Sequence, residues 1–135
     1  MIIKGNRFID ARGTLCYNNN FDASLIKRIY TIENADADFI RGWQGHKIEQ
    51  RWFAALIGSF EISVVLIDDW ANPSKNRPIT KYILTTDSLD YLHVPEGHIT
   101  AIQALEGNSK LLVMTDYLLG ELQDDYRYPI AYFEK

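Results

Sequence analysis

Two apolar segments decide the fold class: Gln50-Arg-Trp-Phe-Ala-Ala-Leu-Ile57 and Phe60-Glu-Ile-Ser-Val-Val-Leu-Ile67, separated only by Gly58-Ser59. Both are rich in the β-branched and aromatic residues typical of strands. In the second segment one face is apolar throughout, whereas the other face begins polar and turns apolar at Val65 and Ile67. We therefore expect its second half to be covered on both sides.

Further segments of the same character lie on either side of this pair. The predicted strands are Leu25 to Ile32, Ile79 to Thr85, Tyr91 to Val94, Ile99 to Leu105 and Leu111 to Thr115. Turn-forming residues separate them, so hairpins are the predicted connections. Several short strands at this spacing favour an all-β sandwich or barrel. For the tail from Leu118 to Lys135, a short helix and a packed extended segment both fit.

Composition limits the class of protein. The 135 residues are 47% hydrophobic and 24% charged, which fits a single globular domain spanning residues 1–135. A net charge of −4 provides no basic field for nucleic acid. The start lacks a signal-peptide pattern, and no apolar run is long enough to span a membrane. The single cysteine, Cys16, cannot form a disulfide within the chain, so a cytoplasmic location is expected.

The most informative histidine lies in Arg41-Gly-Trp-Gln-Gly-His-Lys47. Side chains two apart on a strand share a face, so Gln44 and His46 are expected to project together. This run resembles the RGxHxHK motif of dTDP-4-keto-6-deoxyglucose 3,4-ketoisomerases, and the RGxHxQ motif of dTDP-4-dehydrorhamnose 3,5-epimerases. Both are small cupins of the WxcM-like and RmlC-like kind.

Other short matches follow the order of those families along nearly the whole chain. They are Asp10-Ala-Arg12-Gly13, Asp68 to Ser74, Val94-Pro-Glu-Gly97, Thr115-Asp116-Tyr117 and Asp125-Tyr126-Arg127. The resemblance implies an RmlC-like cupin jelly-roll β-barrel and a homodimer, often with exchanged N-terminal strands. It also implies a nucleotide sugar as the small-molecule partner.

No metal or other cofactor is expected. A metal-binding cupin carries HxH, then Glu, then a later His, and against that pattern this sequence has Gln44, His46, Arg51 and Thr100. One of four ligands remains, and a cation beside Arg51 would be repelled.

Proton transfer beside a ketone requires a base, a donor that polarises the oxygen, and positive charge for the diphosphate. His46 is the candidate base. Gln44 replaces the first motif histidine, and it can form hydrogen bonds but cannot take up a proton. Arg41 matches the motif arginine, and Arg51 lies roughly where the epimerases carry an active-site lysine. Both are candidates for binding anionic oxygens.

The position of the epimerases' acid tyrosine falls near Leu112, which has no proton to give. Candidates to replace that tyrosine are Tyr30, Tyr82, Tyr91 and Tyr117. Tyr91 and His93 share a face by strand spacing, so they are candidate substrate-binding residues at the barrel mouth. A packed, hydrogen-bonded role for His93 fits equally.

Three functions fit these residues. The first is an isomerase acting on a dTDP-4-keto-6-deoxy sugar in polysaccharide biosynthesis, by 3,4-ketoisomerisation or epimerisation. The second is a sugar-binding cupin that has lost its catalytic base, which the replacement by Gln44 favours. The third is a dimerising partner of a sugar transferase.

Overall fold

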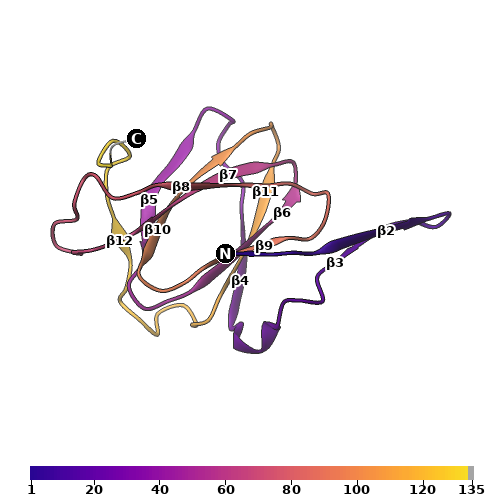
Figure 1. Cartoon of the computed structure of the whole chain (residues 1–135), viewed down its shortest axis with the longest axis horizontal. Helices are drawn as coiled ribbons and strands as arrows, with labels where there is room; N and C mark the ends of the chain where they lie inside the picture. The colour runs from indigo at the N-terminus through magenta and orange to yellow at the C-terminus, as the bar shows by residue number, and fades with distance from the viewer. Residues whose placement is uncertain (134–135) are drawn as a thin grey trace.

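The computed structural model describes residues 1–133, which form two five-stranded antiparallel sheets and one separate hairpin (Figure 1). The first sheet has the order β1 (Ile2–Ile3), β9 (Tyr91–Val94), β6 (Arg51–Ile57), β11 (Lys110–Thr115), β4 (Arg28–Ile32). The second has the order β12 (Tyr126–Arg127), β5 (Ile40–His46), β10 (His98–Ala104), β7 (Phe60–Leu66), β8 (Thr80–Leu84). The expected all-β class and jelly-roll arrangement are confirmed, as a sandwich of two sheets.

All seven strands predicted from the apolar segments are present, with ends moved by a few residues. The largest shift is at Leu25, where the short 3₁₀ turn η1 (Ala23–Leu25) precedes β4. The Asp22 side chain caps this turn by accepting a hydrogen bond from the Ser24 N–H. The tail is extended: residues 118–133 contain β12 and no α-helix. Within residues 1–133, no helix is long and apolar enough to cross a membrane.

The predicted hairpin at Gly58-Ser59 is wrong. β6 pairs with β11 and β9, whereas β7 pairs with β10 and β8, so the two segments lie in different sheets. The turn is a corner at which the chain crosses from one sheet to the other. Gly58 has φ +70° and lies against Ser109, so this corner has neither the conformation nor the space for a side chain. The same crossing separates β9 from β10 and β10 from β11.

The main core lies between the two sheets and is apolar. Its largest fully buried members come from facing strands of both sheets: Phe53, Phe60, Ile62, Leu84, Leu92 and Leu111. Burial of six such side chains stabilises the sandwich by roughly 1.5–3 kcal/mol each. The core therefore fixes the spacing of the sheets from which the polar residues described below project.

Two smaller clusters cover the outer faces. Outside the second sheet, the C-terminal tail packs Phe133 against Trp43, Val65 and Ile67, which confirms the two-sided coverage expected for β7. Outside the first sheet, another cluster contains Trp52, Ala54, Tyr91 and Met114.

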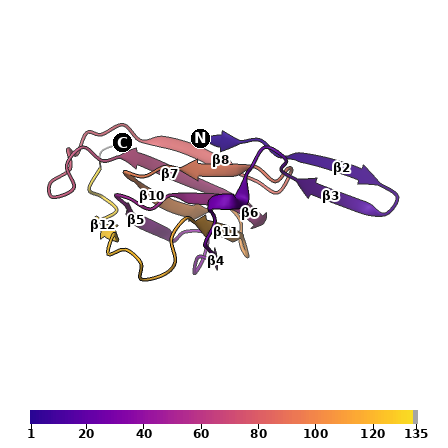
Figure 2. The same cartoon turned by 90° about the horizontal axis from the view of Figure 1, so that it is seen from below.

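The hairpin of β2 (Asn6–Asp10) and β3 (Gly13–Tyr17) projects away from the sandwich (Figures 1 and 2). The residue pattern alone predicted no strand here, although the family resemblance implied N-terminal strands. Phe8, Ile9 and Leu15 are 52%, 62% and 60% exposed. The hairpin therefore carries apolar side chains that the rest of residues 1–133 leaves more than half exposed.

Candidate active site

A cavity of about 330 Å³ opens between the sheets where the apolar core ends. Charged and polar side chains from both sheets and from the C-terminal segment line it, chiefly Arg28, Tyr30, Arg41, Gln44, His46, Glu49, Arg51 and Asp125. The cavity thus collects four of the six site residues expected from sequence: Gln44, His46, Arg41 and Arg51.

A β-bulge in β5 explains how Arg41 reaches the same side as Gln44. Thr100 of β10 pairs with Gln44, but Ile102, two residues on, pairs with Arg41, three residues back. The extra residue changes the alternation of the strand, so positions 41 and 44 both face the cavity. Without it, strand alternation would place them on opposite faces.

Gly45 allows β5 to lie close to β10 at this point. A side chain there would meet the His98 carbonyl oxygen and would lie 2.6 Å from Ile99 Cα. Both obstacles include backbone atoms, which cannot rotate away. Gly45 therefore allows the close strand pairing that positions its two sequence neighbours, Gln44 and His46, in the cavity wall.

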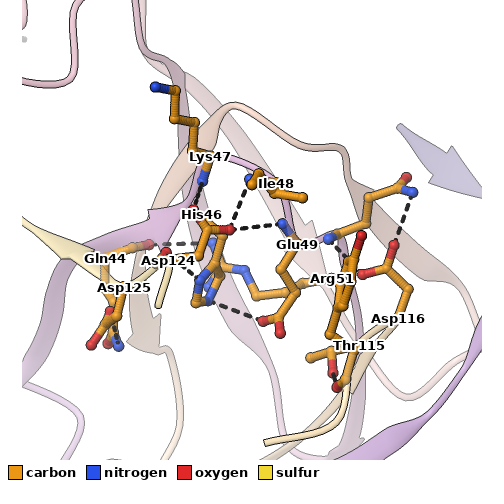
Figure 3. A network of polar contacts seen from close by, with 12 residues as sticks. Gln44, His46, Lys47, Ile48, Glu49, Arg51, Thr115, Asp116, Asp124 and Asp125 are labelled. Carbon is orange, nitrogen blue, oxygen red and sulfur yellow. Dashed lines mark hydrogen bonds and ion pairs between the residues drawn. The ribbon is translucent and has the colours of Figure 1, made fainter. Parts of the chain in front are cut away.

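Both ring nitrogens of His46 have partners (Figure 3). Nδ1 lies 2.8 Å from the carbonyl oxygen of Asp124, and Nε2 lies 3.2 Å from Glu49 Oε2. Because a carbonyl oxygen only accepts, Nδ1 carries a proton and donates it. Burial and then the charge of Arg51 lower the pKa of His46, whereas burial raises the pKa of Glu49.

The buried carboxylate of Asp124 holds the turn that follows β5. It accepts hydrogen bonds from the backbone N–H groups of Lys47, Ile48 and Glu49, at 2.9, 2.8 and 2.9 Å. One residue of the C-terminal segment thus fixes the His46 ring through its carbonyl and the Glu49 backbone through its carboxylate. The neighbouring Asp125 accepts a 2.9 Å hydrogen bond from Gln44 Nε2.

Arg51 is a cation buried at 5% exposure. Its Nη2 donates to the Gln44 carbonyl oxygen at 3.2 Å, and the guanidinium lies 5.2 Å from the centre of the Phe53 ring. Within residues 1–133 no carboxylate forms an ion pair with it. Burial lowers the pKa of Arg51. A buried cation without a paired anion is costly, so this side chain favours an anionic oxygen in the cavity.

Of the four candidate acid tyrosines, Tyr30 is the one that lines the cavity. Arg28 lies over its ring, 4.4 Å from the centroid. Burial raises the pKa of Tyr30, although the charges of Arg51, Arg28 and Arg41 oppose the shift. The Tyr30 hydroxyl therefore remains a proton donor beside a group of guanidinium ions.

The expected position of Tyr91 and His93 at the mouth of the cavity is wrong. The two do share a face of β9, but it is the outer face, because Leu92 and Val94 point into the core. His93 stacks on Trp52 with ring centroids 4.8 Å apart, and its Nε2 lies 2.7 Å from Gln50 Oε1. Neither side chain lines the cavity.

Sequence reasoning gave no role to Glu49 or Asp124. The sequence does place a carboxylate, Glu49, three residues after His46. That spacing brings the two side chains together only because a turn after β5 folds residue 49 back toward His46. Asp124 lies 78 residues from His46. In the described part of the chain, no group of three or more His, Cys, Asp or Glu side chains is arranged to hold a metal ion.

Comparisons with known proteins place this geometry in a family context. The model of the family described as FdtA: WxcM-like, C-terminal, matches residues 1–134. A search of curated proteins found no match. Among solved structures, a double mutant of the 3,4-ketoisomerase QdtA from Thermoanaerobacterium thermosaccharolyticum in complex with TDP is 27% identical, with a TM-score of 0.71. The alignment covers 98% of this chain and 90% of that one.

Two further structures share the fold. A point mutant of the same QdtA in complex with TDP-4-keto-6-deoxyglucose is 24% identical, with a TM-score of 0.72, over 98% of this chain and 89% of that one. The dTDP-4-dehydrorhamnose 3,5-epimerase from Bacillus anthracis, with TDP and PPi bound, is 17% identical, with a TM-score of 0.73. The alignment covers 91% of this chain and 75% of the epimerase chain.

Proposed function

The chain belongs to the FdtA family (WxcM-like, C-terminal), and we propose that it is an isomerase of dTDP-4-keto-6-deoxy sugars. The reaction is a 3,4-ketoisomerisation or an epimerisation by proton transfer, without a metal. The observation that carries the proposal is the cavity in which His46, a candidate base, lies with Arg41 and Arg51. The related QdtA structures in complex with TDP and TDP-4-keto-6-deoxyglucose support this class of substrate.

In the 3,4-ketoisomerisation, the C–H bond at C3 breaks and its electrons form an enediolate with the C4 ketone. The 4-oxygen takes up a proton, the 3-hydroxyl loses one, and C4 is then protonated, so no oxidant or reductant is needed. His46 accepts and returns the carbon-bound proton. Arg51 stabilises the charge that develops on the enediolate oxygen, and Arg41 binds an anionic oxygen of the nucleotide sugar. Gln44, held by Asp125, orients a sugar hydroxyl.

The test is proton NMR of the protein with TDP-4-keto-6-deoxyglucose in deuterium oxide. Exchange of the ring protons beside the ketone, or a new sugar signal, supports the proposal when it disappears in His46→Asn. Saturable binding without exchange would refute isomerisation and favour the second candidate, a sugar-nucleotide-binding cupin. That alternative has its own support, because the replacement of the first motif histidine by Gln44 removes a proton acceptor.

We further propose that the protein forms a homodimer through the projecting β2–β3 hairpin. Phe8, Ile9 and Leu15 are more than half exposed on it, and a second copy provides the simplest apolar cover. Sedimentation of the wild type and of a variant with Phe8→Ser and Leu15→Ser tests this assembly. A wild type that sediments as a monomer would refute it. A cytoplasmic location remains a prediction from the single cysteine.

A further inference from the structure

The contact between His46 and Glu49 implies that the two side chains share a proton. Nδ1 of His46 donates to the carbonyl oxygen of Asp124, so in the neutral ring Nε2 carries a lone pair. Oε2 of Glu49 lies 3.2 Å from that nitrogen. Two lone pairs facing each other at this distance repel. One proton therefore lies between the two atoms, bonded to Oε2 in the neutral pair or to Nε2 in the ionised pair.

The position of Glu49 makes this proton accessible to a ligand. Both side chains are largely buried, with exposures of 16% for His46 and 12% for Glu49, and both line the cavity. Oε1 of Glu49 has no hydrogen-bond or ion-pair partner in residues 1–133, and it is not among the fully buried unpaired atoms. The carboxyl group thus offers one oxygen to His46 and the other to the cavity.

We propose that Glu49 is a second proton-transfer residue of the site and relays the substrate proton to His46; this inference rests on the proposed isomerase function. The C–H bond beside the ketone breaks, and its electrons stay on the substrate as the enediolate that Arg51 stabilises. The proton moves to Glu49 Oε1 while the proton on Oε2 moves to His46 Nε2. The reverse transfer delivers a proton to the neighbouring carbon, so charge and atoms balance.

This relay supplies what the replacement at position 44 removes. Gln44 donates to Asp125 and cannot carry a proton, so His46 alone would have to remove and return the substrate proton. Glu49 adds a second group that changes protonation state. It enters the site from the turn after β5, which the three hydrogen bonds to Asp124 hold in place.

The first experiment measures the shared proton without any sugar. Protein labelled with ¹⁵N-histidine is titrated by long-range ¹H–¹⁵N NMR, and His46→Asn identifies the His46 signals among the three histidines. The charged groups that also influence the pair are Arg28, Arg51, Asp116, Asp124 and Asp125, and all of them are left unchanged. Glu49→Gln should lower the His46 pKa, because a carboxylate partner that favours the protonated ring is lost. Glu33→Gln, an exposed carboxylate elsewhere, should leave it unchanged.

The second experiment measures deuterium exchange into TDP-4-keto-6-deoxyglucose. Glu49→Gln should reduce the exchange rate by at least about 100-fold, while Glu33→Gln keeps the wild-type rate. In Glu49→Ala, added acetate should restore part of the lost rate as a function of its concentration. A merely structural role for Glu49 gives no such rescue.

The outcomes separate the two proposals. Wild-type exchange that persists in Glu49→Gln overturns the relay and leaves the isomerase function standing. An unchanged His46 titration in Glu49→Gln overturns the shared proton, whatever the activity. A wild type that exchanges no ring proton refutes the isomerase function, and with it the relay, although the titration still decides whether the two side chains share a proton.

Discussion

His46 is the last residue of β5 in one sheet and His93 lies within β9 in the other, and burial lowers the pKa of both. Their surroundings differ. His46 faces the cavity between the sheets, where its partners are a carbonyl oxygen and a carboxyl group. His93 lies on an outer face, stacked on Trp52 and hydrogen-bonded to Gln50. A shifted histidine pKa therefore does not mark a functional residue by itself; the face of the sheet and the partner's ability to exchange a proton distinguish the two.

Exchanging each histidine for asparagine is the strongest test of this contrast. His46→Asn should reduce ring-proton exchange by about 1,000-fold, since the base is lost. His93→Asn should leave the exchange rate unchanged and cost about 1 kcal/mol of unfolding free energy, because a stacked ring and a hydrogen bond are lost. NMR exchange and urea denaturation measure the two effects. A large loss of exchange in His93→Asn would contradict the assignment of that residue to a structural role.

The buried cation beside His46 sharpens the contrast between catalysis and stability. Arg51→Met should reduce exchange by about 100-fold, because charge on the enediolate oxygen loses its partner. The same change should raise the unfolding free energy by about 1 kcal/mol or more, since an unpaired buried charge is replaced by an apolar side chain. Chemical denaturation and NMR exchange on one sample measure both. If stability falls instead, Arg51 serves the fold.

Asp124 connects the C-terminal segment to the His46 ring and to the backbone of Glu49. Asp124→Asn keeps the shape but replaces one accepting oxygen by an NH₂ group, so either the Lys47 N–H or the N–H groups of Ile48 and Glu49 lose their acceptor. We expect a loss of about 2 kcal/mol in unfolding free energy, measured by urea denaturation. Asp125→Asn, on an exposed neighbour, is the matched control and should lose less.

The pH dependence of stability gives the smallest effect. The pKa of His46 is lower in the folded protein than its ordinary value of 6.5, so below pH 6.5 the unfolded chain binds a proton that the folded protein does not. This contribution makes stability fall as pH drops from 7 through the folded pKa, by less than about 1.4 kcal/mol per pH unit. The fall should be shallower in His46→Asn, measured by denaturation at a series of pH values. An identical slope in both proteins would contradict the direction of the shift.

The strands of the sandwich could be predicted from the sequence because each carries a periodic apolar face. Phe60 to Ile67 even indicated which half of β7 is covered twice. The connections could not be predicted, since the sequence of a glycine turn such as Gly58 is the same whether the turn closes a hairpin or crosses between sheets. The residue pattern did not predict the β2–β3 hairpin, because its apolar residues Phe8 and Leu15 pair with each other and stay more than half exposed instead of facing the core.

Only those parts of the candidate site that depend on residue spacing within one strand, or on the family resemblance, could be predicted from the sequence. Strand alternation paired Gln44 with His46, and the resemblance to sugar-nucleotide isomerases drew attention to Arg41 and Arg51. Alternation also paired Tyr91 with His93, but it does not say which face of a sheet lies inside. Asp124 acts across 78 residues, and no local pattern announces such a contact.

The closeness of β5 and β10 at Gly45 has a consequence for directed evolution. A library that varies residues 41–51 to change sugar preference should keep Gly45 fixed, because any other residue there collides with the backbone of His98 and Ile99. Gly42, by contrast, has only ordinary contacts, the nearest with Ile130 at 3.6 Å. Diversity at Gly42 is therefore compatible with folding, whereas diversity at Gly45 fills the library with misfolded clones.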